Sequence, residues 1–394
     1  MRKTIYLISA CDRFNYGDLL FNHILEAALP VSLKAEYRIV QVGVLGRKMS
    51  AYGGHDSIGL NRLYRQIQDH DVMIFAGGGL LGHHWDAMLI QYGYGILLRG
   101  TRKVIGHRRF ENLLRRFFFR DLPEYPFIHS RTGLTKKVSI IYNSVGGGAL
   151  QGMSPKELNR IKMRLTDSDY LSVRDNHIFK LLETGDNSPA LSPDSAILLK
   201  EIFPLRQVRK KMSDRGRKII DSIPYILLHC NVRVAVKHMK RIQELIQVLT
   251  TTYDYRILLL PVNYIQNRDL AGLKRISRGG LNGEVLQGYR NIFDICGLIG
   301  HARLVLATSL HVNITAASYG VPHLGLTREI KKVNAYFETW YNGLVHDSYH
   351  PDRLPPAIAQ ALADTGILGK NTNRLCRMAR NNLAAIFRRI AVIS

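Results

Sequence analysis

The sequence predicts an α/β protein with two doubly wound, Rossmann-like domains and a cleft between them. Short apolar runs alternate with segments of helical periodicity along the chain, a pattern typical of parallel sheets covered by helices. The 394 residues are too many for one ordinary core. A charge-rich, poorly periodic stretch at 205–218 is interpreted as an interdomain linker. We therefore divide the chain into a domain at 1–202, a domain at 203–370, and a basic C-terminal helix at 371–394 that packs back on the body.

The elements follow one another in a regular order. Each apolar run ends in a turn, and an amphipathic stretch leads to the next run. Strands are predicted at 4–10, 37–43, 71–77, 137–145, 169–175, 225–231, 255–262, 283–289, 303–309 and 323–327. Helices are predicted at 19–29, 155–165, 176–184, 237–250, 310–319 and 353–363.

Composition narrows the class of protein. Apolar residues make up 46% of the chain, as in globular proteins, and no run approaches the roughly 18 apolar residues of a membrane span. The N-terminal apolar run is short, so we interpret it as a strand rather than a signal peptide and expect a cytoplasmic protein. The four cysteines show no metal-ligand spacing. We expect buried free thiols and no metal site.

The charge balance is unusual. Against 31 Asp+Glu stand 55 Lys+Arg, a formal net charge of +24, which attracts polyanions. The basic segment 99–120 alternates cations with aromatic residues. We expect it to contact an anionic membrane peripherally at the inner face of the cell membrane, with a solvated helix face as the alternative. Nucleic acid is the least favoured partner, because no known nucleic-acid module accompanies the charge.

The turns that follow the strands are the candidate site, because doubly wound sheets bind ligands beyond the carboxyl ends of their strands. Asn15 and Asp18 follow the first strand. Asp18 is a candidate acid or base, or else the N-cap of the next helix. Asn15 is a candidate for binding an acceptor.

A glycine triplet, Gly77, Gly78 and Gly79, follows another strand. Its backbone N–H groups suit a phosphate, and a tight packed turn is the alternative. The triplet fits neither the dinucleotide nor the nucleoside-triphosphate fingerprint, which argues against NAD and ATP. His84 and Asp86, just beyond it, are candidates for lining the cleft and binding an acceptor.

Three more side chains follow strands. Arg174 carries a planar donor fork that grips a carboxylate or phosphate, with a structural ion pair as the alternative. Arg233 is a candidate second anion contact. His311 begins a helix of small residues, where it can bind a phosphate or move a proton. A histidine that only caps the turn is the alternative.

Taken in order, these turns resemble the polysaccharide pyruvyl transferase family. The resemblance implies two Rossmann-like domains in a GT-B-like arrangement, the first binding the acceptor and the second the donor. It also implies transfer of a pyruvyl group from phosphoenolpyruvate to two hydroxyls of a sugar in a surface glycan or its lipid-linked precursor, forming a ketal without an obligatory cofactor. The matching stretches are NYGD (15–18), GGGLL (77–81), NSVGGG (143–148), SVRD (172–175), SPDSA (192–196) and LHVNITAASYGVPHLGLTREIKKV (310–333).

The resemblance assigns donor contacts to His311 and Arg174, but one position departs from the family. The family has Arg two positions before the histidine, where this chain has Ser309. The lost charge-assisted contact is worth roughly 1.5–3 kcal/mol, or about tens- to hundred-fold in affinity. Either another cation such as Arg174 or Arg233 compensates, or the donor has changed, or catalysis is lost.

Two alternatives therefore stay open. One is a GT-B glycosyltransferase that uses a nucleotide sugar. The other is a non-catalytic glycan- or anion-binding relative, which Ser309 motivates. Ligand preference separates the three possibilities.

Overall fold

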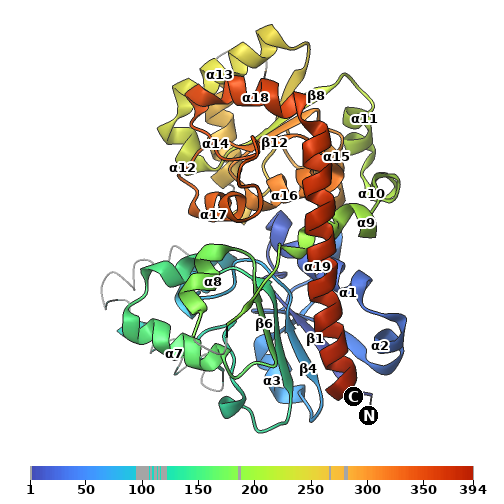
Figure 1. The fold of residues 1–394 in the computed structure, drawn as a ribbon, viewed down its shortest axis with the longest axis vertical. Coiled ribbons are helices and arrows are strands. Elements are labelled where there is room, and N and C mark those ends of the chain that lie inside the picture. Colours follow the sequence, from blue (N-terminus) through green and yellow to red (C-terminus); the bar gives the residue numbers. More distant parts are fainter. Residues whose placement is uncertain are drawn as a thin grey trace.

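The computed structural model describes residues 2–94, 122–184, 188–265, 268–278 and 283–393, with isolated positions between 95 and 121. Most of the predicted basic segment 99–120 lies outside the described residues. Two α/β domains follow each other along the long axis of the molecule (Figure 1).

The first domain is built on a seven-stranded sheet in the order β3-β2-β1-β4-β5-β6-β7. Its neighbouring strands are parallel, and the order reverses beside β1, as in doubly wound folds. The central strands β1, β4 and β5 are buried throughout. The strands are β1 (Thr4–Ile8), β2 (Arg38–Gly43), β3 (Ile58–Gly59), β4 (Val72–Phe75), β5 (Ser139–Val145), β6 (Tyr170–Val173) and β7 (Ala190–Leu191).

The second domain repeats this plan with a five-stranded parallel sheet in the order β10-β9-β8-β11-β12. Here too the central strands β8 and β11 are buried throughout. The strands are β8 (Tyr225–His229), β9 (Arg256–Leu259), β10 (Gly283–Val285), β11 (Leu304–Ala307) and β12 (His323–Gly325).

Helices connect the strands in both domains. Those of the first domain are α1 (Tyr16–Ala28), α2 (Val31–Glu36), α3 (Leu60–Gln66), α4 (Trp85–Leu89), α7 (Pro155–Leu165) and α8 (Asn176–Leu182). Between the sheets lie α9 (Leu199–Ile202), α10 (Leu205–Lys211) and α11 (Asp214–Ile220). After β8 come α12 (Val232–Lys237), α13 (Met239–Thr252), α14 (Arg268–Ser277), α15 (Ile292–Gly300), α16 (Leu310–Tyr319), α17 (Lys331–Trp340), α18 (Leu354–Ala363) and α19 (Thr365–Ile393). Short 3₁₀ or π turns are η1 (Ser50–Tyr52), η2 (Ile90–Tyr94), η3 (Arg131–Gly133), η4 (Gly148–Gly152), η5 (Ser195–Leu198) and η7 (Pro351–Arg353).

The two sheets agree with the fold class predicted from the sequence, and every predicted strand is present. The stretch 205–218, interpreted from the sequence as an interdomain linker, lies between the two sheets along the chain, and it forms α10 and most of α11. Val208 and Met212 are buried in the hydrophobic core, and Ser213 caps α11 while it bonds to Asp294 of α15. The predicted division near residue 202 falls between the two sheets.

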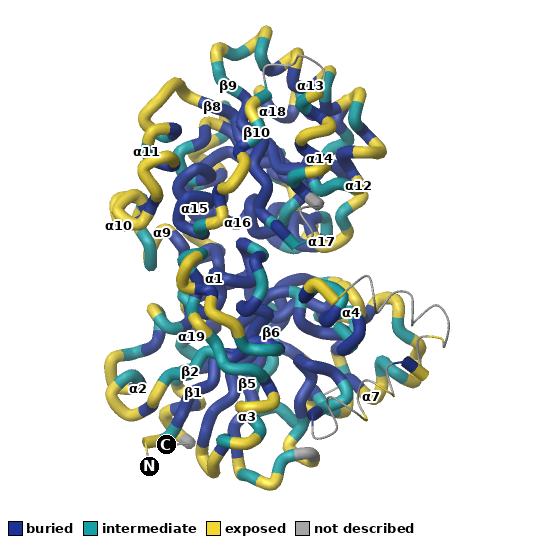
Figure 2. The backbone as a smooth tube through the Cα atoms, turned by 180° about the vertical axis from the view of Figure 1, so that it is seen from behind, coloured by how far each residue is buried: buried dark blue, intermediate teal, exposed yellow. Residues whose placement is uncertain are grey.

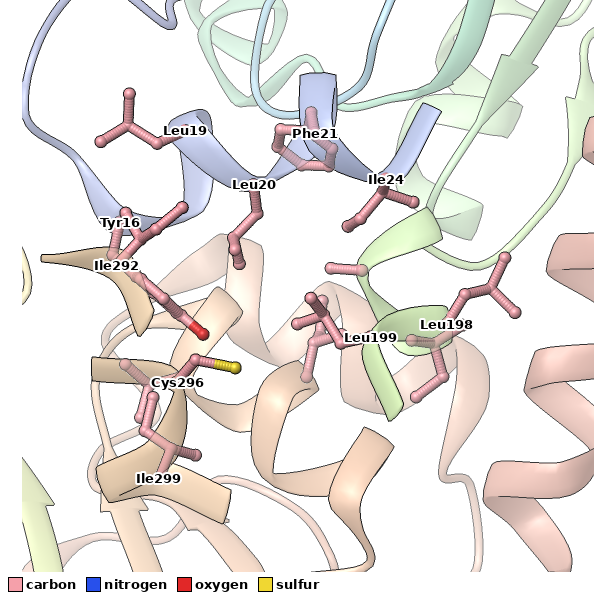
Figure 3. Packing of buried hydrophobic residues seen from close by; sticks show 14 of the residues in the cluster. Tyr16, Leu19, Leu20, Phe21, Ile24, Leu198, Leu199, Ile292, Cys296 and Ile299 are labelled. Carbon is pink, nitrogen blue, oxygen red and sulfur yellow. The ribbon is translucent and has the colours of Figure 1, made fainter. Parts of the chain in front are cut away.

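The domains share one hydrophobic cluster. Leu20 and Ile24 of α1 point toward Leu199 of α9 and Cys296 of α15 (Figure 3). In Figure 2, most of α1 is coloured as buried, and the helix lies between the two domains. An interface of this apolar kind holds two domains in a fixed relation.

Helix α19 spans both domains along the long axis (Figure 1). Its Thr372 hydroxyl donates to the carbonyl of Ala317 in the second domain, and its Asn382 amide donates to Asn143 in the first, 2.8 Å away. The basic C-terminal helix therefore packs on the body, and it begins at Thr365 rather than 371. In the described part of the chain, none of the helices has the length and apolarity that crossing a bilayer requires.

Candidate functional site

Three buried polar side chains meet where the carboxyl ends of the two sheets face each other. Arg174 follows β6, Asp194 follows β7, and His311 lies in the first turn of α16 after β11. Their exposed fractions are 4%, 0% and 7%. Arg174 Nη1 lies 2.9 Å from Asp194 Oδ2, and His311 Nε2 lies 3.6 Å from the same oxygen. One carboxylate oxygen thus faces a guanidinium of its own domain and an imidazole of the other.

Asp194 is held by the turn that it begins. It is the N-cap of η5, and its Oδ1 accepts a hydrogen bond from the Ala196 N–H at 3.1 Å. Burial raises the pKa of the Asp194 carboxyl, but the nearby His311, followed by the charge of Arg174, holds this pKa below its usual value. Asp194 is not among the residues predicted from the sequence, although the SPDSA stretch contains it.

Helix α1 of the first domain encloses the imidazole of His311. Phe21 meets the imidazole edge-on, with ring centroids 5.1 Å apart. A Cβ atom at Gly17 would overlap the His311 ring. Gly17, in the NYGD stretch, therefore allows the two domains to approach closely at the site.

Two donor atoms at this site have no hydrogen-bond partner among the described residues. They are Arg174 Nε and His311 Nε2, the latter too far from Asp194 for a hydrogen bond. Gly146 lies against the guanidinium, since a Cβ there would come within 2.7 Å of Arg174 Nε. Buried donors without a partner are costly, so both atoms are candidates for contacting a bound ligand.

The three glycines after β4 have different neighbours. Gly77 and Gly78 have φ of 126° and 89°, and both pack against the ring of Phe21. This is the packed turn that the sequence left open, and it supports the His311 pocket from behind. Gly79 instead lies beside Arg174, since a Cβ at this glycine would be 3.8 Å from Nη2. Phosphate binding by the triplet stays a prediction.

Lys332, in the first turn of α17, is close enough to Arg174 for the charge of that guanidinium to act on it. Its side chain is exposed, yet desolvation by the surrounding protein and then repulsion from Arg174 lower the pKa of its ammonium group. The charges of Asp18 and Asp269 act in the opposite direction. Charges of both domains therefore act on this exposed ammonium group. Lys332 is a further residue not predicted from the sequence, although REIKK follows β12 closely enough to suggest it.

Asp18, the predicted acid or base, is paired with Arg13. Arg13 Nη2 lies 2.8 Å from Asp18 Oδ2, and both side chains are 10% exposed. Arg13 also donates to Gln91 and lies over the ring of Tyr92. The N-cap of α1 is Asn15, without a side-chain cap bond, so Asp18 does not cap this helix. Asp18 is therefore part of a fixed ion pair.

The predicted acceptor-binding residues have different surroundings. Asn15 forms an antiparallel bridge with Asn263 across the domain boundary. His84 packs on Tyr125, with ring centroids 5.0 Å apart. Asp86 is fully buried at the start of α4. Acceptor contact by Asn15, His84 and Asp86 stays a prediction.

His83, next to His84, interacts with the charges at the cleft. It is half-buried, and desolvation followed by repulsion from Arg13 lowers the pKa of its imidazole to about 4. Asp18 raises this pKa and Lys332 lowers it further. A neutral imidazole at this place can accept a proton or a hydrogen bond.

The residues after β8 contribute less to the site. His229 is 3% exposed and lies between Asp269 Oδ2 and the Thr308 hydroxyl, at 3.1 and 3.2 Å. Arg233, the predicted second anion contact, is exposed on α12. Ser309 is the half-buried N-cap of α16, without a side-chain cap bond.

Thiols and metal ligands do not gather in this region. Among the residues that the structure describes, no group of three or more His, Cys, Asp or Glu side chains could hold a metal. The four cysteines are free and buried. Burial raises the pKa of Cys11 to about 12 and that of Cys296 to about 11, so these thiols remain protonated at neutral pH.

Comparison with models of known protein families identifies the family of this chain. The family model described as polysaccharide pyruvyl transferase matches residues 15–329, a span that includes Asp18, Arg174, Asp194 and His311. The chain belongs to the polysaccharide pyruvyl transferase family. This is a family of transferases of polysaccharide biosynthesis. No curated protein matches the chain.

Solved structures show that this pyruvyl transferase family member has the fold of GT-B enzymes. A putative UDP-N-acetylglucosamine 2-epimerase from Listeria monocytogenes is 12% identical over 98% of this chain and 96% of its own, with a TM-score of 0.55. The corresponding epimerase from Neisseria meningitidis is 11% identical over 98% and 100%, with a TM-score of 0.52. The wall teichoic acid polymerase TagF is 11% identical over 100% and 88%, with a TM-score of 0.52. At these identities the likeness concerns the fold alone.

Ser309 brings no guanidinium to the N-terminus of α16, where the resemblance led us to expect an arginine. Lys332, at the start of α17, is a further cation on which the charge of Arg174 acts. Of the compensating cations suggested by the sequence, Arg174 lies at the site and Arg233 lies on the exposed face of α12.

Proposed function

We propose that the protein transfers a pyruvyl group from phosphoenolpyruvate to two hydroxyls of a sugar in a surface glycan or its lipid-linked precursor. The product is a cyclic ketal, and phosphate is released. The observation that carries this proposal is the meeting of Arg174 and His311 at Asp194, close enough to Lys332 for the charge of Arg174 to act on its ammonium group.

The cations of the cleft suit the donor. Phosphoenolpyruvate carries a phosphate and a carboxylate, so its site needs fixed cations and backbone donors. Arg174 can present its free Nε, and Lys332 can present an ammonium whose pKa rises when an anion approaches. Asp194 holds the Arg174 fork from its other side, so that the fork is oriented before the donor binds.

His311 is the proposed general acid. The Asp194 carboxylate lies 3.6 Å from its Nε2, where it can orient the imidazole for proton transfer. Protonation of the donor's terminal enol carbon leaves a cation-like centre at the next carbon. One sugar hydroxyl adds there and loses its proton to a base. The second hydroxyl displaces phosphate, which leaves with the proton of that hydroxyl. The new C–H bond and the first C–O bond replace the π bond of the enol, and the second C–O bond replaces the C–O bond to phosphate. His83 and Asp18 are candidates for the base.

Calorimetric titration with phosphoenolpyruvate tests the proposal, with UDP-N-acetylglucosamine as the parallel ligand. We expect saturable phosphoenolpyruvate binding that His311→Ala and Arg174→Gln abolish. The matched control is His229→Gln, because His229 is also a buried histidine at the end of a strand but bonds only within the second domain. Binding of the nucleotide sugar alone would favour the glycosyltransferase, and binding of neither ligand would favour a glycan-binding relative.

A further inference from the structure

We infer that the outward face of α19 is a docking surface for an anionic phospholipid membrane. This face, here called the α19 basic face, consists of Lys370, Arg374, Arg377 and Arg388 and ends at Val392. It is distinct from the predicted segment 99–120 and lies on a helix that the structure describes completely up to Ile393.

The basic face is a straight row. At about 100° per residue, its four cations and Val392 fall within roughly 60° of one another around the helix axis. The opposite side holds the buried residues Leu368, Leu375, Leu383, Ile386 and Ile390. Since the rise is about 1.5 Å per residue, the row from Lys370 to Val392 is roughly 33 Å long.

The charge of this row is not neutralised within the helix. No Asp or Glu occurs between Thr365 and Ile393. Lys370, Arg377 and Arg388 are exposed, and none of them forms an ion pair with the residues that the structure describes. Of the flanking cations, Arg380 faces Glu201 at 3.7 Å. Three unpaired cations in one line hold a positive potential that an anionic partner would neutralise.

The basic face lies next to the candidate active site. Arg374 Nη2 donates to the carbonyl of Trp340 at 2.9 Å, and Trp340 Nε1 donates to the carbonyl of Arg174 at 2.8 Å. Two hydrogen bonds therefore connect the row to the backbone of the proposed donor contact. A membrane against α19 would touch both domains, because the helix spans both (Figure 1), and would bring the cleft close to the lipid headgroups.

The shape of the row favours a lipid surface over nucleic acid. A straight row of cations on one helix fits a plane, whereas single-stranded nucleic acid needs a groove with aromatic side chains for stacking. The row contains no aromatic residue and ends in a valine that is 87% exposed. Cations followed by an exposed apolar end are typical of segments that lie at a membrane interface.

Vesicle sedimentation tests the inference on the full chain. We expect binding to vesicles of phosphatidylglycerol and phosphatidylcholine, weakened by salt, and no binding to phosphatidylcholine alone. Each cation near an anionic surface contributes about fivefold in affinity. The triple variant Lys370→Gln, Arg377→Gln, Arg388→Gln should therefore lose on the order of a hundredfold.

The control variant removes the same number of positive charges from another part of the surface. Lys240→Gln, Lys274→Gln and Arg275→Gln neutralise exposed cations on α13 and α14, and we expect only a small loss. An equal loss in both triple variants would overturn the inference, because net charge alone would then explain binding. The inference would also be wrong if the wild-type protein did not bind anionic vesicles. The same holds if the triple variant in α19 lost affinity for a DNA duplex but not for vesicles. Phosphoenolpyruvate binding is a separate readout, so failure here leaves the proposed function untouched.

Discussion

Two adjacent lysines at the start of α17 have unequal surroundings. Both are exposed, but the charges of Arg174 and Arg13 act on Lys332, whose pKa is lowered first by desolvation. We expect Lys332→Met to raise the dissociation constant for phosphoenolpyruvate by about ten- to hundredfold, because a charge-assisted contact contributes roughly 1.5–3 kcal/mol. Titration calorimetry measures this.

Lys331→Met is the matched control for this prediction. It removes the same charge one residue away, and the affinity should stay within about twofold, as expected of a charge that makes no direct contact. Neither change should lower the melting temperature, since both side chains are exposed. Equal losses in the two variants would show that Lys332 acts only through the general field of the cleft.

For an alanine at position 17, helix propensity and steric overlap with a neighbouring side chain predict opposite effects. Alanine is about 1 kcal/mol better than glycine inside a helix, so Gly17→Ala in α1 should stabilise the protein if nothing else intervened. The new Cβ would overlap the imidazole of His311. We therefore expect turnover to fall about a hundredfold, since misplacing a catalytic group by about 1 Å has this effect. Steady-state phosphate release measures it.

Gly369→Ala in α19 provides the comparison. No atom lies within 4 Å of a Cβ built at this glycine, so alanine should raise the unfolding free energy by about 0.5–1 kcal/mol with turnover unchanged. If Gly17→Ala behaved in the same way, the His311 ring would have room to move, and the close approach of α1 would not matter for the site.

At the scale of elements, periodicity identified every strand of three or more residues and missed the two-residue strands, together with the helices α14, α15 and α17. Each predicted strand is a run of apolar residues, and such runs are visible locally. Strands β3 and β7 have two residues each, too few for any pattern. Asp194 was therefore missed, because its place at a strand end follows from β7. The helical nature of 205–218 depends on Val208 and Met212 meeting α15, a tertiary contact that local composition does not contain.

Of the site, too, only a part could be predicted from the sequence. Arg174 and His311 could be predicted, because each directly follows a recognisable strand. Their meeting at one oxygen of Asp194 could not, because it depends on how α1 fixes the two domains. Lys332 follows β12 by several residues, so its position in the cleft depends on the direction of α17.

Helix α17 connects the second domain to Arg174 through a hydrogen bond, and the effect of removing this bond can be predicted. Trp340 Nε1 donates to the Arg174 carbonyl at 2.8 Å. Trp340→Phe removes the bond but keeps an aromatic ring, and we expect a loss of about 1–2 kcal/mol in unfolding free energy together with weaker phosphoenolpyruvate binding. Urea unfolding and calorimetry give the two quantities.

The second tryptophan allows a matched control. Trp85 Nε1 donates to the Pro123 carbonyl at 2.9 Å within the first domain, so Trp85→Phe should cost similar stability without changing donor affinity. Unchanged donor affinity in Trp340→Phe would mean that α17 stabilises the fold but does not position Arg174.

At the scale of the whole molecule, the shared cluster makes the two domains one unit. Residues of α1, α9, α15, α16 and α19 belong to the same apolar cluster, and Tyr16 of α1 reaches Thr315 of α16 with a 3.0 Å hydrogen bond. Opening the cleft widely would expose this cluster. The site is thus formed before the donor arrives, and unfolding of either domain should disturb the other, so a single unfolding free energy can be compared across pH.

Buried histidines predict how that free energy depends on pH. His129, His323 and His346 are at most 1% exposed. Burial, the largest cause for each, lowers their pKa values to about 4, about 3 and about 4. An unfolded histidine titrates near 6.5, so below that pH the unfolded chain binds more protons than the folded one. Stability is therefore complete above about pH 6.5 and is lost as pH falls toward the folded pKa values.

The size of this loss can be tested by urea unfolding. Between pH 7.5 and 5.5 each of these histidines should remove about 1.3 kcal/mol, or about 4 kcal/mol for the three. His346 has no hydrogen-bond partner among the described residues, so His346→Leu should reduce the loss between pH 7.5 and 5.5 by about 1.3 kcal/mol, whatever it does to stability at pH 7.5. A flat profile over this range would mean that protons reach these histidines in the folded protein, which contradicts the burial of the histidines within the two packed domains.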